Sequence, residues 1–102
     1  MLVQGSNRRL DITGSLDEEA KAWISDVVEL HTDCYLEVDL PSKGRLIIKK
    51  QETDGSWPKA MITKWTGPNI RVRIYGSTNG AFLKFCLSDA PTRIQLFKIE
   101  SG

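Results

Sequence analysis

The residues best suited to nucleophilic or acid–base chemistry are one histidine and two cysteines. Cys34 follows His31 by three residues, a spacing that invites a cysteine–histidine dyad. The spacing of apolar residues, however, predicts that a helix ends between His31 and Cys34. It places Cys34 on the apolar face of the following strand, where a thiol is buried and inert. Cys34 and Cys86 are too few for a disulfide framework and fit no zinc spacing, so we expect two buried thiols unless adjacent strands pair them.

Two carboxylates also lie two residues apart within a predicted strand. In "CYLEVDL", Glu37 and Asp39 fall on one face, about 7 Å apart by strand geometry, a distance that a metal site or a glycosidase pair could use. Their commoner role is cross-strand pairing with cations such as Arg45 and Lys49. The segment "GSTNG" at 76–80 lacks the lysine of a phosphate loop and is typical of a hairpin turn. We therefore expect no catalytic residue, metal or cofactor, and a protein that is not an enzyme.

A basic strand is followed directly by that turn. "IRVRIY" places Arg71, Arg73 and Tyr75 on the face opposite its apolar residues. If the turn joins this strand to "AFLKFCL" as a hairpin, Lys84 shares the face with them. Such a mixture of cations and rings suits single-stranded RNA or DNA, whose phosphates and bases it can contact. Alternating arginines equally keep an exposed face soluble and discourage edge pairing.

Charge is divided unevenly between the two parts of the chain. Residues 1–41 carry three basic and nine acidic side chains, a balance of −6, whereas residues 42–102 carry eleven and four, a balance of +7. The sum is the net charge of +1, modest for a dedicated nucleic-acid-binding protein. The division favours either pairing across a sheet, an anionic partner, or a contact between copies.

The segment after Gly14 has the features of an amphipathic helix. Ser15 and Glu18 fit a capping box, and acidic residues follow in the first turn. An apolar stripe recurs at spacings of three and four residues, ending at His31. A helix is predicted over about 16–31, preceded by a weaker strand in "RRLDIT".

From Cys34 onward the apolar period changes to two, and turn signals recur at "PSKG", "TDG", "TGPN", "STNG" and "SDAP". The pattern predicts an antiparallel meander of about five to six strands over about 34–99, as an open sheet or a partly closed barrel. The fold class is therefore α+β, with the helix packed on the sheet and residues 1–102 forming a single domain. Because Phe97 and Ile99 follow out of phase with Ile94 and Leu96, a bulge or a second buried face is expected near the end.

These features favour a non-catalytic binding module that acts through its sheet surface. Trp57 and Trp65 suit a protein contact, because aromatic side chains are enriched at interfaces. The first expectation is a protein partner or self-association, and the alternative is single-stranded nucleic acid. Candidate binding residues are Arg71, Arg73, Tyr75, Lys84, Trp57 and Trp65. The chain has no apolar run long enough for a membrane span and no secretory signal, so a cytoplasmic location without a membrane partner is expected.

Overall fold

The computed structural model describes residues 2–3, 10–57 and 63–98, and the regular secondary structure within these ranges is all β-strand. There are nine strands in this part of the chain: β1 (Leu2–Val3), β2 (Leu10–Asp11), β3 (Gly14–Asp17), β4 (Ala22–Ser25), β5 (Val28–Leu30), β6 (Cys34–Lys50), β7 (Thr63–Ile74), β8 (Ala81–Leu87) and β9 (Arg93–Lys98).

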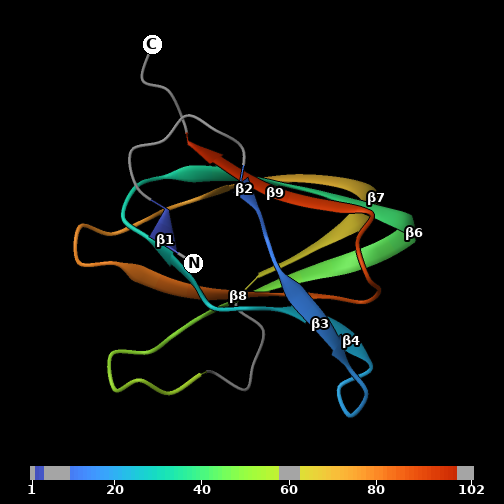
Figure 1. Ribbon diagram of the computed structural model, residues 1–102, viewed down its shortest axis with the longest axis horizontal. Helices are drawn as coiled ribbons and strands as arrows, with labels where there is room; N and C mark the ends of the chain where they lie inside the picture. The colour runs from blue at the N-terminus through green and yellow to red at the C-terminus, as the bar shows by residue number, and fades with distance from the viewer. Residues whose placement is uncertain (1, 4–9, 58–62, 99–102) are drawn as a thin grey trace.

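The strands form one curled sheet whose two halves face each other across the core (Figure 1). One half contains β2, β9, the first part of β6 and the second part of β7. The other contains β3, β4, β5, β8, the second part of β6 and the first part of β7. Neighbouring strands are antiparallel except β1 and β5, which are parallel. The architecture is thus all-β, with the sheet curled into a half-barrel.

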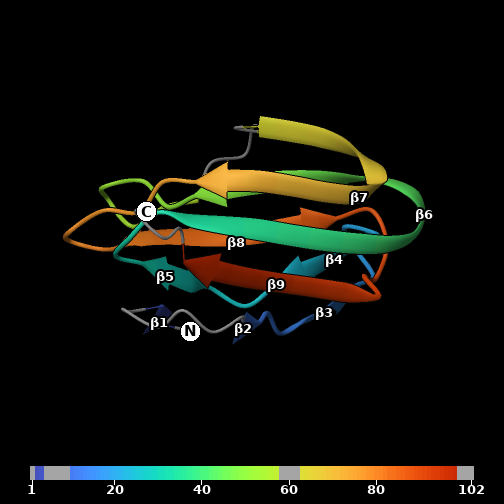
Figure 2. The same cartoon turned by 90° about the horizontal axis from the view of Figure 1, so that it is seen from above.

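The curl is produced by a bend in β6 that its partner β7 follows (Figure 2). The register between them shifts between Asp39 and Gly44, and beyond the shift Gly44 lies opposite Gly67. Gly67 has a φ of 141°, which an L side chain rarely adopts. The segments "PSKG" and "TGPN" were expected to reverse the chain between separate strands. They instead form the bend, so each predicted pair of strands is one long, bent strand.

The predicted helix over 16–31 is wrong, and with it the α+β class. Residues 18–21 form the turn of a β3–β4 hairpin in which Lys21 has a positive φ of 51°. The Asp17 carboxylate accepts hydrogen bonds from the backbone amides of Glu19 and Ala20. These amides belong to the turn and not to the first turn of a helix. Leu16 is 62% exposed although it begins the apolar stripe.

Burial in this segment instead follows a period of two. Trp23 and Ser25 point inward from β4, and Val28 and Leu30 point inward from β5. Both strands pair with β8, which supplies the long-range partners that local periodicity cannot reveal. Ile24, Val27 and Val28 are β-branched, and such side chains pack well on a pleated surface. Tertiary pairing therefore overrides the helical pattern.

The turn at 77–80 is confirmed, but the hairpin inferred from it is wrong. Gly80 has a φ of 92°, and its amide donates to the carbonyl of Ser77 at 2.9 Å. Strands β7 and β8, which flank the turn, do not pair with each other. Residues 69–74 of β7, just before the turn, pair with the first part of β6, whereas β8, just after it, pairs with the second part. The turn therefore crosses from one half of the sheet to the other, and this separates Arg71 and Arg73 from Lys84.

The core lies between the two halves and is apolar. Fully buried side chains come from both, with exposure below 2%. They are Val28, Leu30, Cys34, Leu36, Val38, Leu46, Phe85, Leu87 and Leu96. The described part of β9 continues in register with β6 from Arg93 to Lys98, so the bulge expected there does not occur within it. Phe97 points outward, and Ile99 lies outside the described residues.

Ser25 provides a direct test of this strand arrangement. Its buried hydroxyl accepts a hydrogen bond of 2.8 Å from the Phe85 amide, which extends the pairing between β4 and β8. The same hydroxyl donates a hydrogen bond to the carbonyl of Asp26. Ser25→Ala leaves the Phe85 amide unsatisfied, and we expect a loss of about 1–3 kcal/mol in the free energy of unfolding. Urea denaturation measures it. Ser42→Ala, at an exposed position, is the control and should change stability by less than about 0.5 kcal/mol; equal effects would contradict the assigned pairing.

Candidate functional site

The outer face of β9, β6 and β7 collects most of the polar side chains that the sequence singled out. Tyr35 lies opposite Phe97 on one side and Arg73 on the other, and Glu37 lies opposite Arg71. Residues directly opposite in antiparallel strands share a face. We call Tyr35, Arg71, Arg73, Tyr75 and Phe97 the arginine–aromatic face.

Each arginine of this face lies over aromatic rings. The Arg71 guanidinium carbon is 4.6 Å from the ring centroid of Tyr35 and 5.5 Å from that of Phe97. The Tyr35 and Phe97 rings are themselves 5.5 Å apart and tilted by 33°. Arg73 lies 5.3 Å from the ring of Tyr75, which is 67% exposed. Such contacts contribute about 0.5–1 kcal/mol each at exposed sites and hold the long side chains in defined positions.

Both arginines also face carboxylates. Arg71 Nε is 3.8 Å from Glu37 Oε2, and Arg73 Nη2 is 3.4 Å from Asp33 Oδ2. The arginine side chains are 59% and 50% exposed, so each pair adds little to stability. The pairs do, however, neutralise the local charge. The "RVR" segment therefore does not present two unpaired cations.

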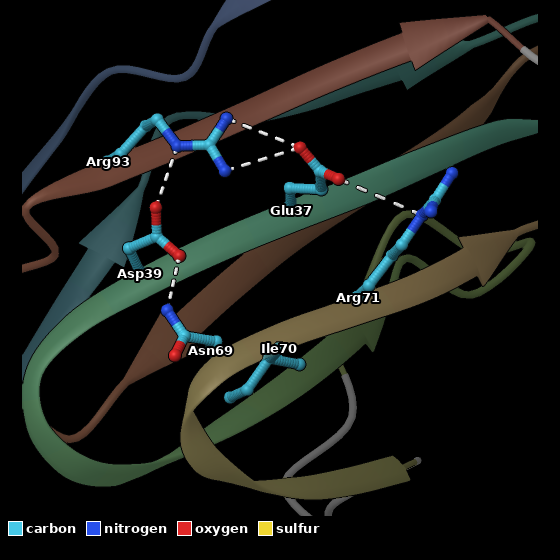
Figure 3. A pocket seen from close by; sticks show the side chains of 6 residues that line it. All are labelled: Glu37, Asp39, Asn69, Ile70, Arg71 and Arg93. Carbon is cyan, nitrogen blue, oxygen red and sulfur yellow. Dashed lines mark hydrogen bonds and ion pairs between the residues drawn. The ribbon is translucent and has the colours of Figure 1, made fainter.

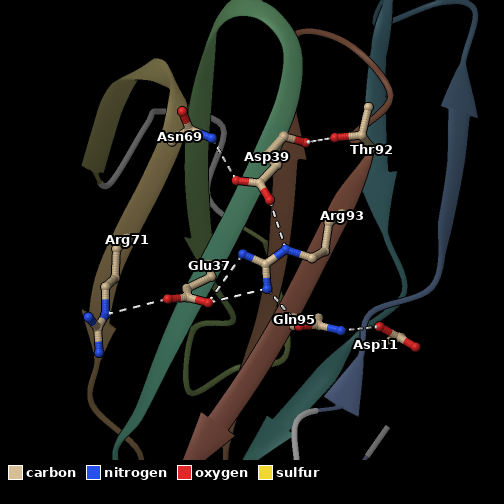
Figure 4. A network of polar contacts seen from close by, with 8 residues as sticks. All are labelled: Asp11, Glu37, Asp39, Asn69, Arg71, Thr92, Arg93 and Gln95. Carbon is tan, nitrogen blue, oxygen red and sulfur yellow. Dashed lines mark hydrogen bonds and ion pairs between the residues drawn. The ribbon is translucent and has the colours of Figure 1, made fainter.

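Arg93 organises a polar network beside this face (Figure 4). Its Nε donates to Asp39 at 2.8 Å, and both terminal nitrogens lie 3.2 Å from Glu37 Oε1. Gln95 bridges Arg93 to Asp11 through two further hydrogen bonds of 2.8 Å. The cross-strand partners of Glu37 are thus Arg93 of β9 and Arg71 of β7, and the partner of Asp39 is Arg93. The predicted partners were Arg45 and Lys49.

The network keeps Asp39 ionised. The hydrogen bond from Arg93, followed by one from Asn69, holds the pKa of the Asp39 carboxyl below its usual value of 3.8. The same bond to Asp39 is the main cause that raises the pKa of Arg93. A shallow pocket of about 210 Å³ opens beside these groups (Figure 3), and Glu37, Asp39, Asn69, Ile70, Arg71 and Arg93 line it. Because Arg93 binds both carboxylates, they are arranged as ion-pair partners and not as an acid–base pair.

The other predicted binding residues lie elsewhere. Lys84 is on the outer face of the opposite half of the sheet, where its Nζ is 4.6 Å from the ring of Trp57. Trp65 lies opposite Leu46 and packs against the core, so it is only partly accessible. The structure therefore brings together Arg71, Arg73 and Tyr75 but separates them from Lys84, Trp57 and Trp65.

Sequence reasoning missed Phe97 and Arg93 as members of the site. The signal for both was the alternation in "TRIQLFKI", in which Arg93, Gln95 and Phe97 fall opposite Ile94 and Leu96. The prediction that Phe97 is out of phase with Ile94 and Leu96 did not assign it to this outward face. The alternation in "CYLEVDL" did place Tyr35, Glu37 and Asp39 on one outward face, as the structure has them.

His31 and Cys34 do not form a dyad. The ring nitrogens of His31 lie 2.5 Å from Glu29 Oε2 and 3.2 Å from the carbonyl of Thr78, so both face acceptors. The Cys34 thiol is buried and donates to the carbonyl of Thr32. Cys86 is likewise buried, and burial raises the pKa of its thiol. The expectation of two buried thiols is confirmed.

Within the described ranges, no group of three or more histidine, cysteine, aspartate or glutamate residues could hold a metal ion. The same part of the chain includes no helix long and apolar enough to cross a membrane. No protein-family model, curated protein or solved structure matches the chain.

The Arg93 network predicts how Asp39 titrates. Arg93→Gln removes the main cause of its lowered pKa, so the pKa should rise toward 3.8, with Asn69 limiting the change. NMR titration of the carboxyl carbons measures this shift. Asp54, whose pKa is lowered by hydrogen bonds from Ser56, is an internal control and should not move.

The sign of the stability effect follows from that direction. A pKa depressed in the folded state stabilises the protein above pH 3.8, and the contribution is lost as the pH falls through the lower folded value. Acid destabilisation below about pH 4 should therefore be weaker in the Arg93→Gln variant, relative to its own neutral-pH stability. An Asp39 pKa unchanged by the substitution would contradict the network.

His31 titrates in the opposite sense. The hydrogen bond to Glu29 is the largest cause that raises its pKa above 6.5, followed by the carbonyl of Thr78. The resulting stabilisation is fully present below pH 6.5 and is lost as the pH rises through the higher folded value. Glu29→Gln should lower the pKa toward 6.5. Because the chain has one histidine, its ring proton resonance reports this directly, and Glu52→Gln should leave it unchanged.

Proposed function

We propose that the protein is a non-catalytic binding module that recognises another protein through the arginine–aromatic face. The observation that carries the proposal is the packing of Arg71 and Arg73 on aromatic rings while carboxylates neutralise them. Tyrosine and arginine dominate the residues whose removal costs most at protein interfaces. On this face they are pre-positioned, so less side-chain entropy is lost on binding.

Charge balance favours a protein over a nucleic acid at this face. Three arginines face three carboxylates, through the ion pairs of Arg71 with Glu37, Arg73 with Asp33, and Arg93 with Glu37 and Asp39. Affinity for phosphate backbones comes from cations that release counterions, which paired arginines do poorly. A mixed surface of rings and compensated charges is typical of protein contacts.

The assignment to a binding role rather than an enzyme is part of the proposal. It is supported by the engagement of the candidate catalytic groups in structural contacts: His31 with Glu29 and Thr78, and Glu37 and Asp39 with Arg93. We also place the protein in the cytoplasm, a location in which thiols such as Cys34 and Cys86 stay reduced.

A photoreactive phenylalanine analogue in place of Tyr75 tests the face in an extract of the source organism. We expect it to cross-link a protein that the same analogue in place of Thr53, an exposed residue of the 53–55 turn, does not capture. Arg71→Ala together with Arg73→Ala should reduce the affinity for that protein at least tenfold, about 1.4 kcal/mol.

Lys43→Ala together with Arg45→Ala provides the matched control, because it removes two exposed cations away from the face. The control should bind the captured protein within twofold of the unmodified chain. The same proteins captured at both positions, or equal losses in the two double variants, would rule out this face as the interface.

A further inference from the structure

The outer face of the opposite half of the sheet carries a second set of cations and rings. Lys49 on β6 lies directly opposite Lys84 on β8, and Phe82 precedes Lys84 by two residues on the same side of β8. The Trp57 ring lies 4.6 Å from Lys84 Nζ. We call Lys49, Lys84, Trp57 and Phe82 the lysine–aromatic face.

The two lysines lie in the row of outward positions next to a buried thiol. Cys86 lies in the neighbouring row of this face, opposite Ile47 on β6 and Ile24 on β4. The charges of Lys49 and Lys84 both act to lower the pKa of Cys86, against the larger effect of its burial. The strand register places Lys49 and Lys84 directly opposite each other, beside Cys86.

This lysine pair lacks the neutralisation seen at the arginine–aromatic face. Like charges directly opposite each other on neighbouring strands destabilise a sheet. Within the part of the chain that the structure describes, no carboxylate lies within 4.0 Å of the Lys49 or Lys84 ammonium. An anion between the two lysines would relieve their repulsion.

Three carboxylates on this half of the sheet are bound to their own neighbours. Asp17 and Asp26 line a pocket of about 400 Å³ together with Lys84. The hydroxyl of Thr13 donates to Asp26 at 2.5 Å, and Asp17 accepts two backbone amides of its turn. Glu29, opposite Phe82, is paired with His31. These contacts orient the carboxylates toward their own partners, and none of them forms an ion pair with Lys49 or Lys84.

The rings beside the lysines specify the class of anion. Phe82 is 36% exposed on a strand surface, where a base can stack on it. The Trp57 ring contacts the ammonium of Lys84, which lies opposite Lys49 in the strand register. Lysine acts on phosphate as a point charge and does not require fork geometry. Cations that contact the backbone beside a ring that contacts a base are the shared features of single-strand binding surfaces.

We propose that the lysine–aromatic face binds single-stranded nucleic acid, with a backbone phosphate between Lys49 and Lys84 and an adjacent base on Phe82. This site lies on the half of the sheet opposite the proposed protein interface and does not depend on it. Its small number of cations predicts weak binding without strong sequence preference, detectable at low salt.

Fluorescence anisotropy of labelled oligouridylate and oligothymidylate, at low and moderate salt, tests the proposal. Lys49→Gln together with Lys84→Gln should weaken binding at least tenfold at low salt. The double variant should also reduce the slope of log affinity against log salt by about 0.7 for each lost phosphate contact. The matched control, Arg71→Gln together with Arg73→Gln, removes the same charge from the opposite face and should bind within twofold of the unmodified chain.

A second pair of variants examines stacking separately from charge. Phe82→Ala should weaken binding about fivefold, within the range measured for base–aromatic stacking, without changing the salt slope. Tyr75→Ala, which removes a more exposed ring from the arginine–aromatic face, should have no effect. Circular dichroism melts establish that each variant remains folded at the assay temperature.

Three results would overturn the proposal. The first is no binding of either oligonucleotide at low salt. The second is an equal loss in the lysine and arginine double variants, which would indicate attraction by net charge alone. The third is equally strong, lysine-dependent binding to vesicles of anionic phospholipid, which would assign the face to a lipid surface. Failure of any kind here leaves the cross-linking result at Tyr75 unaffected, so the two proposals are tested independently.

Discussion

Strand β6 is the element on which both surfaces depend, because it pairs with β7 along its length, with β9 in its first part and with β8 in its second. Side chains alternate along it, and Leu36, Val38 and Leu46 fill the core. A register slip of one residue would turn this apolar set outward, so burial fixes the register strongly. The bend between Asp39 and Gly44 then places the outward residues of its two parts on different sides of the molecule.

The two faces differ in the chemistry of their cations. Guanidinium groups are planar, stack on rings and bind carboxylates through several nitrogens, as Arg71 and Arg93 do. Ammonium groups are compact and strongly hydrated, and Lys49 and Lys84 lie opposite each other without a carboxylate partner among the described residues. The arginines of one half of the sheet are thus paired with carboxylates, whereas Lys49 and Lys84 on the other half are not.

Local patterns predicted the strands from Cys34 onward and the turns at 53–55 and 77–80, because alternation and glycine-containing turns have local causes. They did not predict the strand at Ala22–Ser25, where the spacing of Trp23, Ile24 and Val27 fits a helix equally well and only pairing with β8 decides. Nor could the sequence show that "PSKG" and "TGPN" form one shared bend. That error carried over to the site, since joining β7 to β8 as a hairpin placed Lys84 beside Arg71 and Arg73.

Amide chemical-shift mapping tests most directly whether the two outer faces have different partners. Oligouridylate is added at low salt to the ¹⁵N-labelled, unmodified chain. If the faces differ as proposed, we expect saturable shifts at Lys49, Phe82 and Lys84, with the amides of Arg71, Arg73 and Phe97 unchanged. Shifts concentrated on Arg71 and Arg73 would contradict it, because the neutralised face would then be the one that binds phosphate.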